Sequence, residues 1–319
     1  PDVELVVGDV RDGVAVEAAL AGVDAVIHLA AAMDVGESIF EVERCTSVNY
    51  VGTAVLMDRL RRGSVERLIL ASSMSIYGEG LYRDPATGAR REVRRRTLDQ
   101  LRQGRWEPQP GLEPVPTHER TTPSLGRSVY ARSKYDQERL CLRFAHAAEL
   151  PTLALRLFSV FGARQSPANP YTGELSAYAS RLVQGRRPLV LEDGEQQRDF
   201  VHVRDAVAAF RRALDVEIVP HHHVINIGSG RARSFGAVAR RMAEVLDRPE
   251  LVPEATGKYD IHDVRHCFAD VVRAQQVLGY RADVDLDDGL ADLLDFVGSH
   301  PGVKRAAPRA FFDMGTQAS

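Results

Sequence analysis

Apolar and polar positions follow two rhythms along the first half of the chain. Short apolar runs bounded by turn residues are typical of buried parallel strands, and longer stretches with helical spacing of apolar residues are typical of helices. The pattern predicts strands over residues 5–7, 23–30, 67–72 and 152–157, and helices over residues 14–21, 48–61 and 128–150. Such alternation predicts an α/β fold, a doubly wound parallel sheet with helices on both faces.

The alternation of strand and helix patterns is less regular after residue 78. Residues 79–127 contain no clear sheet element, which is long for a plain loop and predicts an insertion with its own short helix or a lid. The arginine run from Arg90 to Arg96 favours a solvated helix face, with phosphate binding or an interface as the alternative. Beyond this insertion, we expect helices over residues 175–184, 203–214 and 235–246 and strands over residues 188–191 and 223–227.

One motif is missing. A dinucleotide-binding sheet usually begins with a strand, a GxGxxG loop and a helix, whose backbone amides hold the pyrophosphate. The sequence has no such loop near its start, and Gly228-Ser-Gly230 comes too late. We therefore expect that an N-terminal β-α-β unit with its glycine loop is absent from the sequence, with a mature chain starting at Pro1 as the alternative.

Composition excludes several classes of partner. The net charge of −3 provides no basic field for nucleic acid. No apolar run approaches the roughly 20 residues of a membrane-spanning helix. Cys45, Cys141 and Cys267 form no CxxC pair, which favours a reducing, cytoplasmic compartment and no bound metal.

Lysine usage draws attention to one position. The 41 basic residues include three lysines, Lys134, Lys258 and Lys304. Lys134 follows Tyr130 by four residues, so both side chains lie on one face of the predicted helix. An ammonium there lowers the pKa of a phenol, and the pair becomes a general base for a substrate hydroxyl. A surface tyrosine–lysine pair is the alternative.

Hydroxyl groups follow the predicted strand over residues 67–72. Ligands of a parallel sheet gather at the carboxyl ends of its strands. A hydroxyl of the segment from Ser72 to Gly78 is therefore expected to serve the same substrate oxygen as Tyr130, with an ordinary strand-end turn as the alternative.

A set of motifs occurs in order over residues 1–297. These motifs are Gly8-Asp-Val-Arg-Asp12, Val26-Ile-His-Leu-Ala-Ala31, Asn49-x-x-Gly-Thr53, Ser72-Ser-x-x-x-Tyr-Gly78, Tyr130-x-x-x-Lys134, Arg198-Asp-Phe-Val-His-Val203, Asp263-Val-Arg-His-Cys-Phe-Ala-Asp270, Gln165-Ser-Pro-Ala-Asn-Pro-Tyr-Thr-Gly173 and Glu192-Asp-Gly194. With them the sequence resembles the extended short-chain dehydrogenase/reductase family of NAD-dependent sugar-nucleotide epimerases and dehydratases, and within it the nucleoside-diphosphate-hexose 4-epimerases of the dTDP-L-rhamnose 4-epimerase type.

The resemblance implies a Rossmann-like NAD-binding domain over residues 1–159 and 201–227. A smaller C-terminal substrate-binding domain would comprise residues 160–200 and 228–297, followed by a tail over residues 298–319. It also implies tightly bound NAD, a nucleotide-sugar substrate and a homodimer formed through the helices predicted over residues 48–61 and 128–150.

Site residues are implied in the same way. The catalytic residues would be Ser73, Tyr130 and Lys134. The cofactor would contact Asp9, Val10, Leu29, Ala30, Ala31, Met33, Val48, Asn49, Ser72 and Phe158, together with Tyr130 and Lys134. The substrate would contact Ser75, Ser159, Glu174, Leu175, Leu191, Arg198 and Arg265.

Local differences narrow the reaction. Related dehydratases carry Asp-Glu after the catalytic hydroxyl, whereas this chain has Met74-Ser75, so dehydration lacks its acid–base pair. The remaining chemistry is 4-epimerisation through a transient 4-keto sugar, with a 4-ketoreductase or dehydrogenase, or a non-catalytic binding protein, as alternatives. Ser159 replaces an asparagine, and Asp260 replaces a diphosphate-binding arginine for which Lys258 or Arg265 would compensate. These differences favour an unusual substrate, as in antibiotic biosynthesis.

Overall fold

Four parallel strands form the central sheet, in the order β1-β2-β6-β10. They are β1 (Ala25–His28), β2 (Arg67–Ser73), β6 (Thr152–Leu157) and β10 (His223–Ile227). The computed structural model describes residues 3–32, 42–125, 128–165, 173–217 and 223–300. Alternate positions of β2 point to opposite faces of the sheet, so Leu68 and Leu70 join one apolar core and Ile69 joins another.

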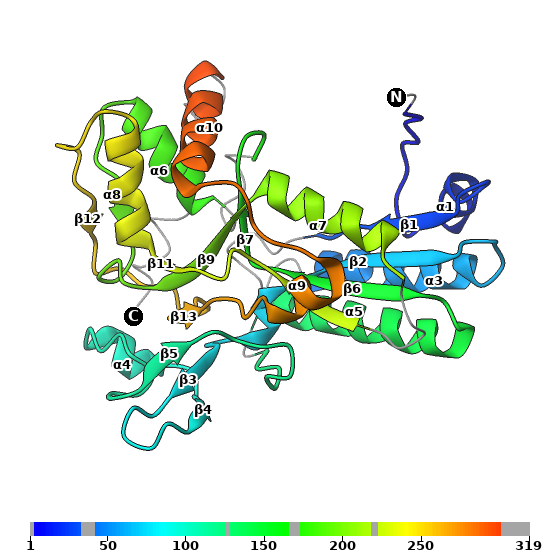
Figure 1. Cartoon of the computed structure of the whole chain (residues 1–319), viewed down its shortest axis with the longest axis horizontal. Coiled ribbons are helices and arrows are strands. Elements are labelled where there is room, and N and C mark those ends of the chain that lie inside the picture. Colours follow the sequence, from blue (N-terminus) through cyan, green and yellow to red (C-terminus); the bar gives the residue numbers. More distant parts are fainter. Residues whose placement is uncertain (1–2, 33–41, 126–127, 166–172, 218–222, 301–319) are drawn as a thin grey trace.

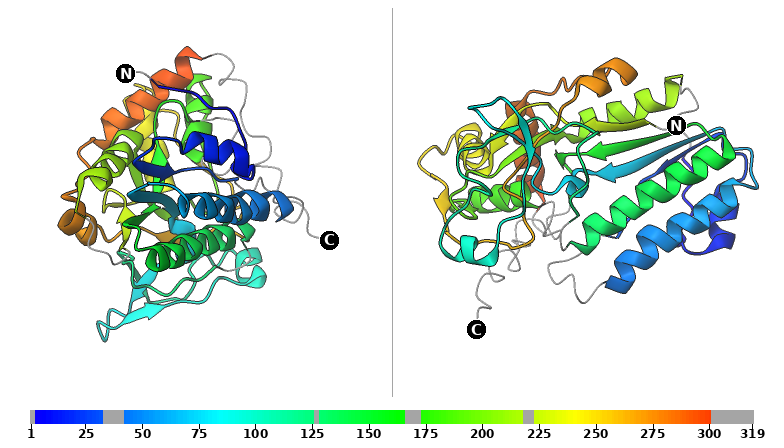
Figure 2. Two further views of the ribbon diagram at one scale, coloured as in Figure 1. Left: turned by 90° about the vertical axis from the view of Figure 1, so that its right-hand side faces the viewer. Right: turned by 90° about the horizontal axis from the view of Figure 1, so that it is seen from below.

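Helices cover both faces of this sheet (Figures 1 and 2). The first face packs against α1 (Gly13–Ala19), α3 (Thr53–Leu60) and α5 (Val129–Ala148), and the second against α7 (Val203–Asp215) and α9 (Val272–Leu278). The predicted doubly wound parallel sheet is therefore confirmed. Its burial is deep, since Leu68, Ile69 and Leu153 are 0% exposed.

The helical region before β2 differs from the prediction of one helix over residues 48–61. It consists of α2 (Val42–Thr46), a π-helical segment η1 (Ser47–Gly52) and then α3. A π-helical turn commonly marks a functional position in a helix. Here it carries Asn49, whose side chain is fully buried.

A second set of elements forms the left-hand part of Figure 1. The strand β9 (Gln197–His202) pairs with β7 (Ser159–Phe161), β11 (Ala232–Ser234) and β13 (His266–Cys267), and β8 (Leu189–Val190) pairs with β12 (Glu254–Ala255). The helices α6 (Glu174–Val183), α8 (Phe235–Val245) and α10 (Leu286–Ser299) enclose the apolar core of this part.

The insertion contains more structure than the sequence indicated. After a 3-10 turn η2 (Met74–Tyr77), the strands β3 (Leu81–Arg83), β4 (Arg90–Glu92) and β5 (Glu113–Val115) form an antiparallel sheet. The predicted short helix is α4 (Leu98–Arg102), which starts with a capping box between Thr97 and Gln100. The interpretation of residues 90–96 as a solvated helix face is wrong, because the run begins in β4 and Arg96 is buried.

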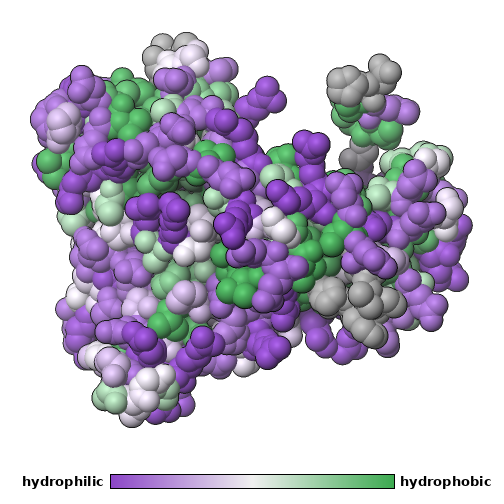
Figure 3. All heavy atoms as spheres, in the orientation of Figure 1, coloured by the Kyte–Doolittle hydropathy of each residue, from purple (hydrophilic) through white to green (hydrophobic). Residues whose placement is uncertain are grey.

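The strand predicted over residues 5–7 is also wrong. No described strand pairs with this segment, which stands away from the sheet in Figures 1 and 3. Val3, Leu5 and Val7 are 83%, 84% and 89% exposed. Their alternation matches a strand, but a strand needs a partner for its backbone hydrogen bonds. Across the described ranges, no helix is both long and apolar enough to span a membrane.

Candidate active site

Two serines at the end of β2 face different surroundings. Ser72 is buried and donates to Glu138 Oε2 at 2.6 Å. Ser73 is half-buried, and its Oγ accepts from the backbone N–H of Ser75 at 3.1 Å, capping η2. The strand end therefore presents the Ser73 hydroxyl to the site, while Ser72 is held in the interior.

The first turn of α5 brings Tyr130 to this strand end. Ser128 caps the helix by accepting from the N–H of Ala131 at 3.1 Å. The Ser73 side chain lies close enough to the Tyr130 phenol to affect its ionisation. Burial raises the pKa of Tyr130 to about 12, and the Ser73 hydroxyl opposes this shift. The structure thus brings together a phenol and a hydroxyl that are 57 residues apart in sequence.

Lys134 lies one turn further along α5 and is 3% exposed. Its Nζ donates to Ala71 O at 2.7 Å and to Gln137 Oε1. Burial lowers the pKa of Lys134 to about 8. The predicted lowering of the Tyr130 pKa by this ammonium is not present in the described arrangement, because Lys134 is engaged by Ala71 and Gln137 and burial of the phenol dominates.

Asn49 fastens the loop after β1 to α5. Its Oδ1 accepts from Ala32 N at 2.6 Å, and its Nδ2 donates to Ala32 O at 2.8 Å and to Ser133 Oγ at 2.9 Å. Ser133 Oγ in turn donates to Tyr130 O at 2.9 Å. Asn49 therefore holds the turn that carries Tyr130 against the carboxyl end of β1.

The other predicted cofactor residues lie mainly along the same edge. Leu29, Ala30 and Ala31 are exposed directly after β1, and Val48 is half-buried in η1. Asp9 is exposed and pairs with Arg11, whose hydrogen bonds lower the pKa of Asp9 to about 2. Val10 packs beside α1 and α3, Phe158 is buried near Tyr77, and Met33 lies outside the described residues.

Predicted substrate residues form two groups. Ser75 and Ser159 lie near the ends of β2 and β6, and the buried Oγ of Ser75 has no described hydrogen-bond partner. Glu174 and Leu191 line a cavity of about 10 Å³, with Leu175 buried beside Glu174 in α6. Burial and the nearby Asp263 raise the pKa of Glu174 to about 7.

Both predicted substrate arginines are engaged by protein groups. Arg198 donates to Asp263 Oδ1 at 2.5 Å and to Val264 O at 2.6 Å. Arg265 is 2% exposed and pairs with Glu107, Glu192 and Asp193. The structure thus places Arg265 in an ion network, and its role toward a substrate stays a prediction.

Three site residues were not predicted from the sequence. Gln137 receives the Lys134 hydrogen bond, and Thr53 and His28 contact Gln137 from other elements. Gln137 follows Lys134 by three residues, so its side chain shares the helix face, which was the available signal. Thr53 and His28 belong to motifs that carry the family resemblance, but their contacts with Gln137 could not be predicted because these residues are remote from it in sequence.

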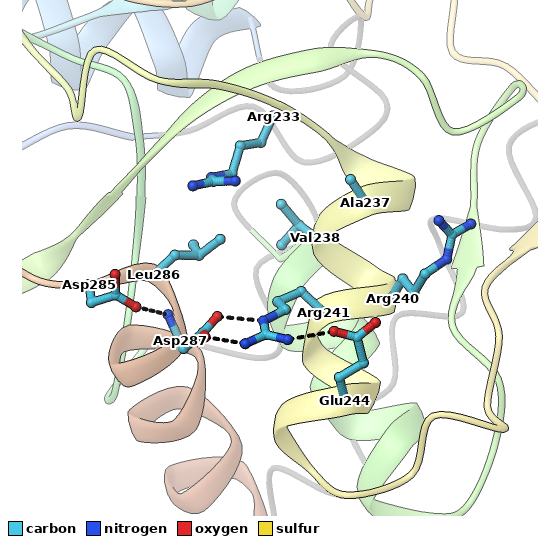
Figure 4. Close-up of a pocket in the computed structure, with 9 residues that line it drawn as sticks. All are labelled: Arg233, Ala237, Val238, Arg240, Arg241, Glu244, Asp285, Leu286 and Asp287. Atoms are coloured by element: carbon cyan, nitrogen blue, oxygen red, sulfur yellow. Dashed lines mark hydrogen bonds and ion pairs between the residues drawn. The ribbon is translucent and has the colours of Figure 1, made fainter.

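A cavity of about 360 Å³ lies elsewhere, between α8 and the start of α10 (Figure 4). None of its lining residues is a predicted site residue. Arg241 bridges Glu244 and Asp287 across it, and all three side chains are well exposed. It offers no buried acid–base group, so the chemistry is assigned to the site around Tyr130.

Two protein-family models match different parts of the chain. Residues 104–228 match the NAD dependent epimerase/dehydratase family, and residues 2–100 match the 3-beta hydroxysteroid dehydrogenase/isomerase family. A dTDP-L-rhamnose 4-epimerase of Burkholderia thailandensis is 35% identical over 300 residues, which are 92% of this chain and 81% of that protein. The chain belongs to the NAD-dependent epimerase/dehydratase family. The predicted family, the extended short-chain dehydrogenases/reductases, is confirmed.

Solved structures of the family share its fold. MoeE5 in complex with UDP-glucuronic acid and NAD is 31% identical, with a TM-score of 0.70 over 91% of this chain and 84% of that one. A UDP-glucose 4-epimerase of Thermotoga maritima with UDP-glucose is 26% identical, with a TM-score of 0.72 over 91% and 82%. The chain is thus an NAD-dependent enzyme of the epimerase type, as predicted.

The described residues fit one side of an NAD molecule. The exposed backbone of Leu29–Ala31 borders the carboxyl end of β1, where a parallel sheet binds its ligands. Tyr130 and Lys134 stand at the neighbouring strand end, and the orphaned Ser75 Oγ leaves a buried polar atom for a ligand beside them. NAD supplies an acceptor and donor of hydride when bound.

Proposed function

We propose that this chain is a nucleotide-sugar 4-epimerase whose substrate is a dTDP-hexose. The proximity of the Ser73 and Tyr130 side chains at the carboxyl end of β2, in an NAD-dependent fold, carries the proposal. The proteins to which the chain is similar include a dTDP-L-rhamnose 4-epimerase and UDP-glucose 4-epimerases.

Tyr130 removes the proton of the sugar 4-hydroxyl, and Ser73 hydrogen-bonds to the same oxygen. The loss of hydride from C4 leaves a 4-keto sugar, which turns over and regains hydride on its opposite face. Tyr130 then returns the proton to the oxygen. Because the sugar regains its hydride in each cycle, turnover would require no added nicotinamide.

The loop after Ser73 supports epimerisation over dehydration. Met74 and Ser75 cannot exchange a proton with the sugar at neutral pH. The following carboxyl group, Glu79, is 2% exposed and accepts from the N–H of Arg265 at 2.6 Å. A second carboxylate for expelling water is therefore not offered by this loop.

The proposed site residues divide by position. Asp9, Val10, Leu29–Ala31, Met33, Val48, Asn49, Ser72 and Phe158 belong to the cofactor side, together with Tyr130 and Lys134. Ser75, Ser159, Glu174, Leu175, Leu191, Arg198 and Arg265 belong to the substrate side.

The function is tested by incubating the chain with dTDP-L-rhamnose and with UDP-glucose. We expect C4 epimers of the dTDP-sugar to interconvert without added nicotinamide, and Tyr130→Phe to lose at least about 10²-fold in kcat. Tyr50→Phe, which changes an exposed tyrosine, is the matched control. Turnover that consumes NAD(P)H in stoichiometric amounts would replace the epimerase by a ketoreductase.

We also propose a homodimer in which α3 and α5 of each subunit form a four-helix contact. These helices lie side by side on one side of the sheet (Figure 2), and Val51 on the adjoining turn is 47% exposed. Light scattering of the eluting protein would show twice the 35.2 kDa of one chain. A monomeric mass at micromolar concentration would exclude the proposed contact.

A further inference from the structure

Gln137 is a fully buried amide on α5, one turn after Lys134. Its Oε1 accepts from Lys134 Nζ, which also donates to Ala71 O. The ammonium is thus held between a backbone carbonyl at the end of β2 and a side-chain carbonyl on its own helix. Two acceptors replace the water that burial removes from the charge.

The surroundings fix which way the amide points. Gln137 Nε2 lies 2.9 Å from Thr53 Oγ1, 3.1 Å from His28 Nε2 and 3.4 Å from Ala30 O. Thr53 donates its hydroxyl hydrogen to Asn49 O at 2.7 Å, so its oxygen accepts from Gln137. A reversed amide would bring oxygen to the Ala30 carbonyl and NH₂ to the ammonium, and both contacts repel.

His28 closes this cluster from β1. Its Nε2 lies 2.8 Å from Thr53 Oγ1, and the ring is 4% exposed. Burial, aided by the charge of Lys134, lowers the pKa of His28 to about 4, so the ring is neutral at pH 7. Lys134 is therefore the cation that this cluster supports.

We propose that Gln137 is a positioning residue for the reaction: its amide, oriented by Thr53, holds Lys134 protonated and fixed at the end of β2. This inference rests on the proposed catalytic role of Lys134. No described hydrogen bond joins Gln137 to Tyr130. Gln137 meets the predicted ligand edge at the Ala30 carbonyl, and it acts on the reaction through the lysine.

Other groups near Lys134 belong to two elements. Glu138 and Cys141 lie on α5, and Cys45 lies on α2; each favours the charged ammonium. Glu138 is itself paired with Arg156, so its charge is largely compensated. Glu138, Cys141 and Cys45 are present in both Gln137 variants described below. These variants therefore differ from the wild type only in the side chain at residue 137.

Gln137→Met removes the amide at similar length, and Gln137→Glu keeps an oxygen but adds a negative charge. The first takes an acceptor from the ammonium, which lowers the pKa of Lys134 from about 8 by on the order of one pH unit. The second places an opposite charge beside it, which raises the pKa. A purely structural role would not move the two in opposite directions.

The three lysines make a direct titration practicable. Carbon-13 labelling at lysine Cε gives three resonances, and Lys258→Arg and Lys304→Arg identify that of Lys134 by elimination. We expect the Lys134 midpoint to fall in Gln137→Met and to rise in Gln137→Glu. Leu140→Ala, an apolar change on the same helix, should leave the midpoint in place.

An unchanged Lys134 midpoint in both variants would overturn the inference, as would a shift in the same direction. Should Gln137→Met fail to fold, Thr53→Val tests the same orientation, because it frees the amide to turn and should lower the midpoint. The lower-pH limb of the kcat profile should follow each midpoint, because the pKa of Lys134 lies below that of Tyr130. Full activity of Lys134→Met would instead refute the proposed function, while the titration would still report on Gln137.

Discussion

At the residue scale, burial acts on the two titratable groups of the site in opposite directions. It disfavours a phenolate and an ammonium alike, so the pKa of Tyr130 rises to about 12 and that of Lys134 falls to about 8. Between these values both groups are neutral. Although the Ser73 hydroxyl opposes the shift, the pKa of Tyr130 stays above its ordinary value of 10.0, so the described arrangement favours the neutral phenol.

Ser73→Ala should lower kcat by about 10²-fold, the lower end of the range for a lost acid–base partner. The Ser73 hydroxyl lowers the pKa of Tyr130, so its removal raises that pKa. Because the pKa of Tyr130, about 12, lies above that of Lys134, about 8, the high-pH limb of the kcat profile should move to higher pH. Ser73→Thr keeps a hydroxyl and should restore most of the activity. A Ser73→Ala enzyme with an unshifted limb would show that Ser73 does not act on Tyr130.

The sequence predicted Ser73, Tyr130 and Lys134 because their chemistry is legible in local spacing and strand ends. It did not predict Gln137, Thr53 and His28, whose importance arises from contacts among β1, α3 and α5. Nor could it show that Arg265 is enclosed by carboxylates, since Glu107, Glu192 and Asp193 lie far from it along the chain.

At the element scale, α5 is joined to β6 by a buried ion pair. Arg156 donates to Glu138 at 3.0 Å from Nε and 2.6 Å from the adjacent guanidinium nitrogen. Ser72 and Tyr77 complete the bonds of the two partners. Because this cluster lies directly beneath Ser73, it fixes the distance between the strand end and the helix that carries Tyr130.

Glu138→Leu should lower the free energy of unfolding by about 3–5 kcal/mol, because it leaves the Arg156 charge buried and unpaired. Asp136→Asn breaks the exposed pair of Asp136 with Arg132 on the same helix and should cost less than about 1 kcal/mol. Urea unfolding of both variants measures the contrast. Equal losses would mean that the Glu138 pair is effectively solvated.

Elements differ in how far their sequence defines them. The bounds predicted for β6 and β10 agree with the structure, because apolar runs buried on both faces need no further context. The three-residue strands of the insertion were not predicted, since a run so short has no readable period. Residues 5–7 have the period of a strand but no described partner.

At the scale of the whole molecule, the insertion is attached to the second part of the chain by charge. Arg96 in the insertion pairs with Glu192 at 2.6 Å, and Arg265 pairs with Glu192 at 3.0 Å and with Glu107 of the insertion at 2.8 Å. Glu192 therefore receives one arginine from each side. The run at residues 90–96 contributes to this attachment through Arg96. The Arg96 side chain can be buried because its charge is paired with Glu192.

Arg96→Met should detach the insertion locally. It leaves Glu79 and Glu192 buried without this cation, so we expect a loss of about 3 kcal/mol or more in unfolding free energy. Arg91→Met, which changes an exposed arginine of β4, is the matched control. Hydrogen exchange should rise over residues 79–125 in the first variant. Unchanged protection there would mean that apolar contacts alone hold the insertion.

Acid should weaken this attachment through Glu107. Burial opposes its ionisation, but hydrogen bonds and charges from His266 and Arg265 prevail and lower the pKa of Glu107 from 4.5 to about 2. A depressed pKa in the folded state contributes stability above pH 4.5, and that stability is lost as pH falls through about 2. Glu107→Gln should therefore destabilise the chain at pH 7, and its difference from the wild type should shrink between pH 4.5 and 2.

The loss at pH 7 should be modest, since the Glu107 side chain is 44% exposed and water screens its charge. Glu113→Gln, in the exposed pair with Arg83 in the same insertion, is the matched control and should cost little. Unfolding in urea at a series of pH values measures both variants. A Glu107→Gln difference that stays constant from pH 7 to pH 2 would mean that the carboxylate charge contributes nothing, and that the hydrogen bonds to Arg265 and His266 hold this end of the insertion irrespective of ionisation.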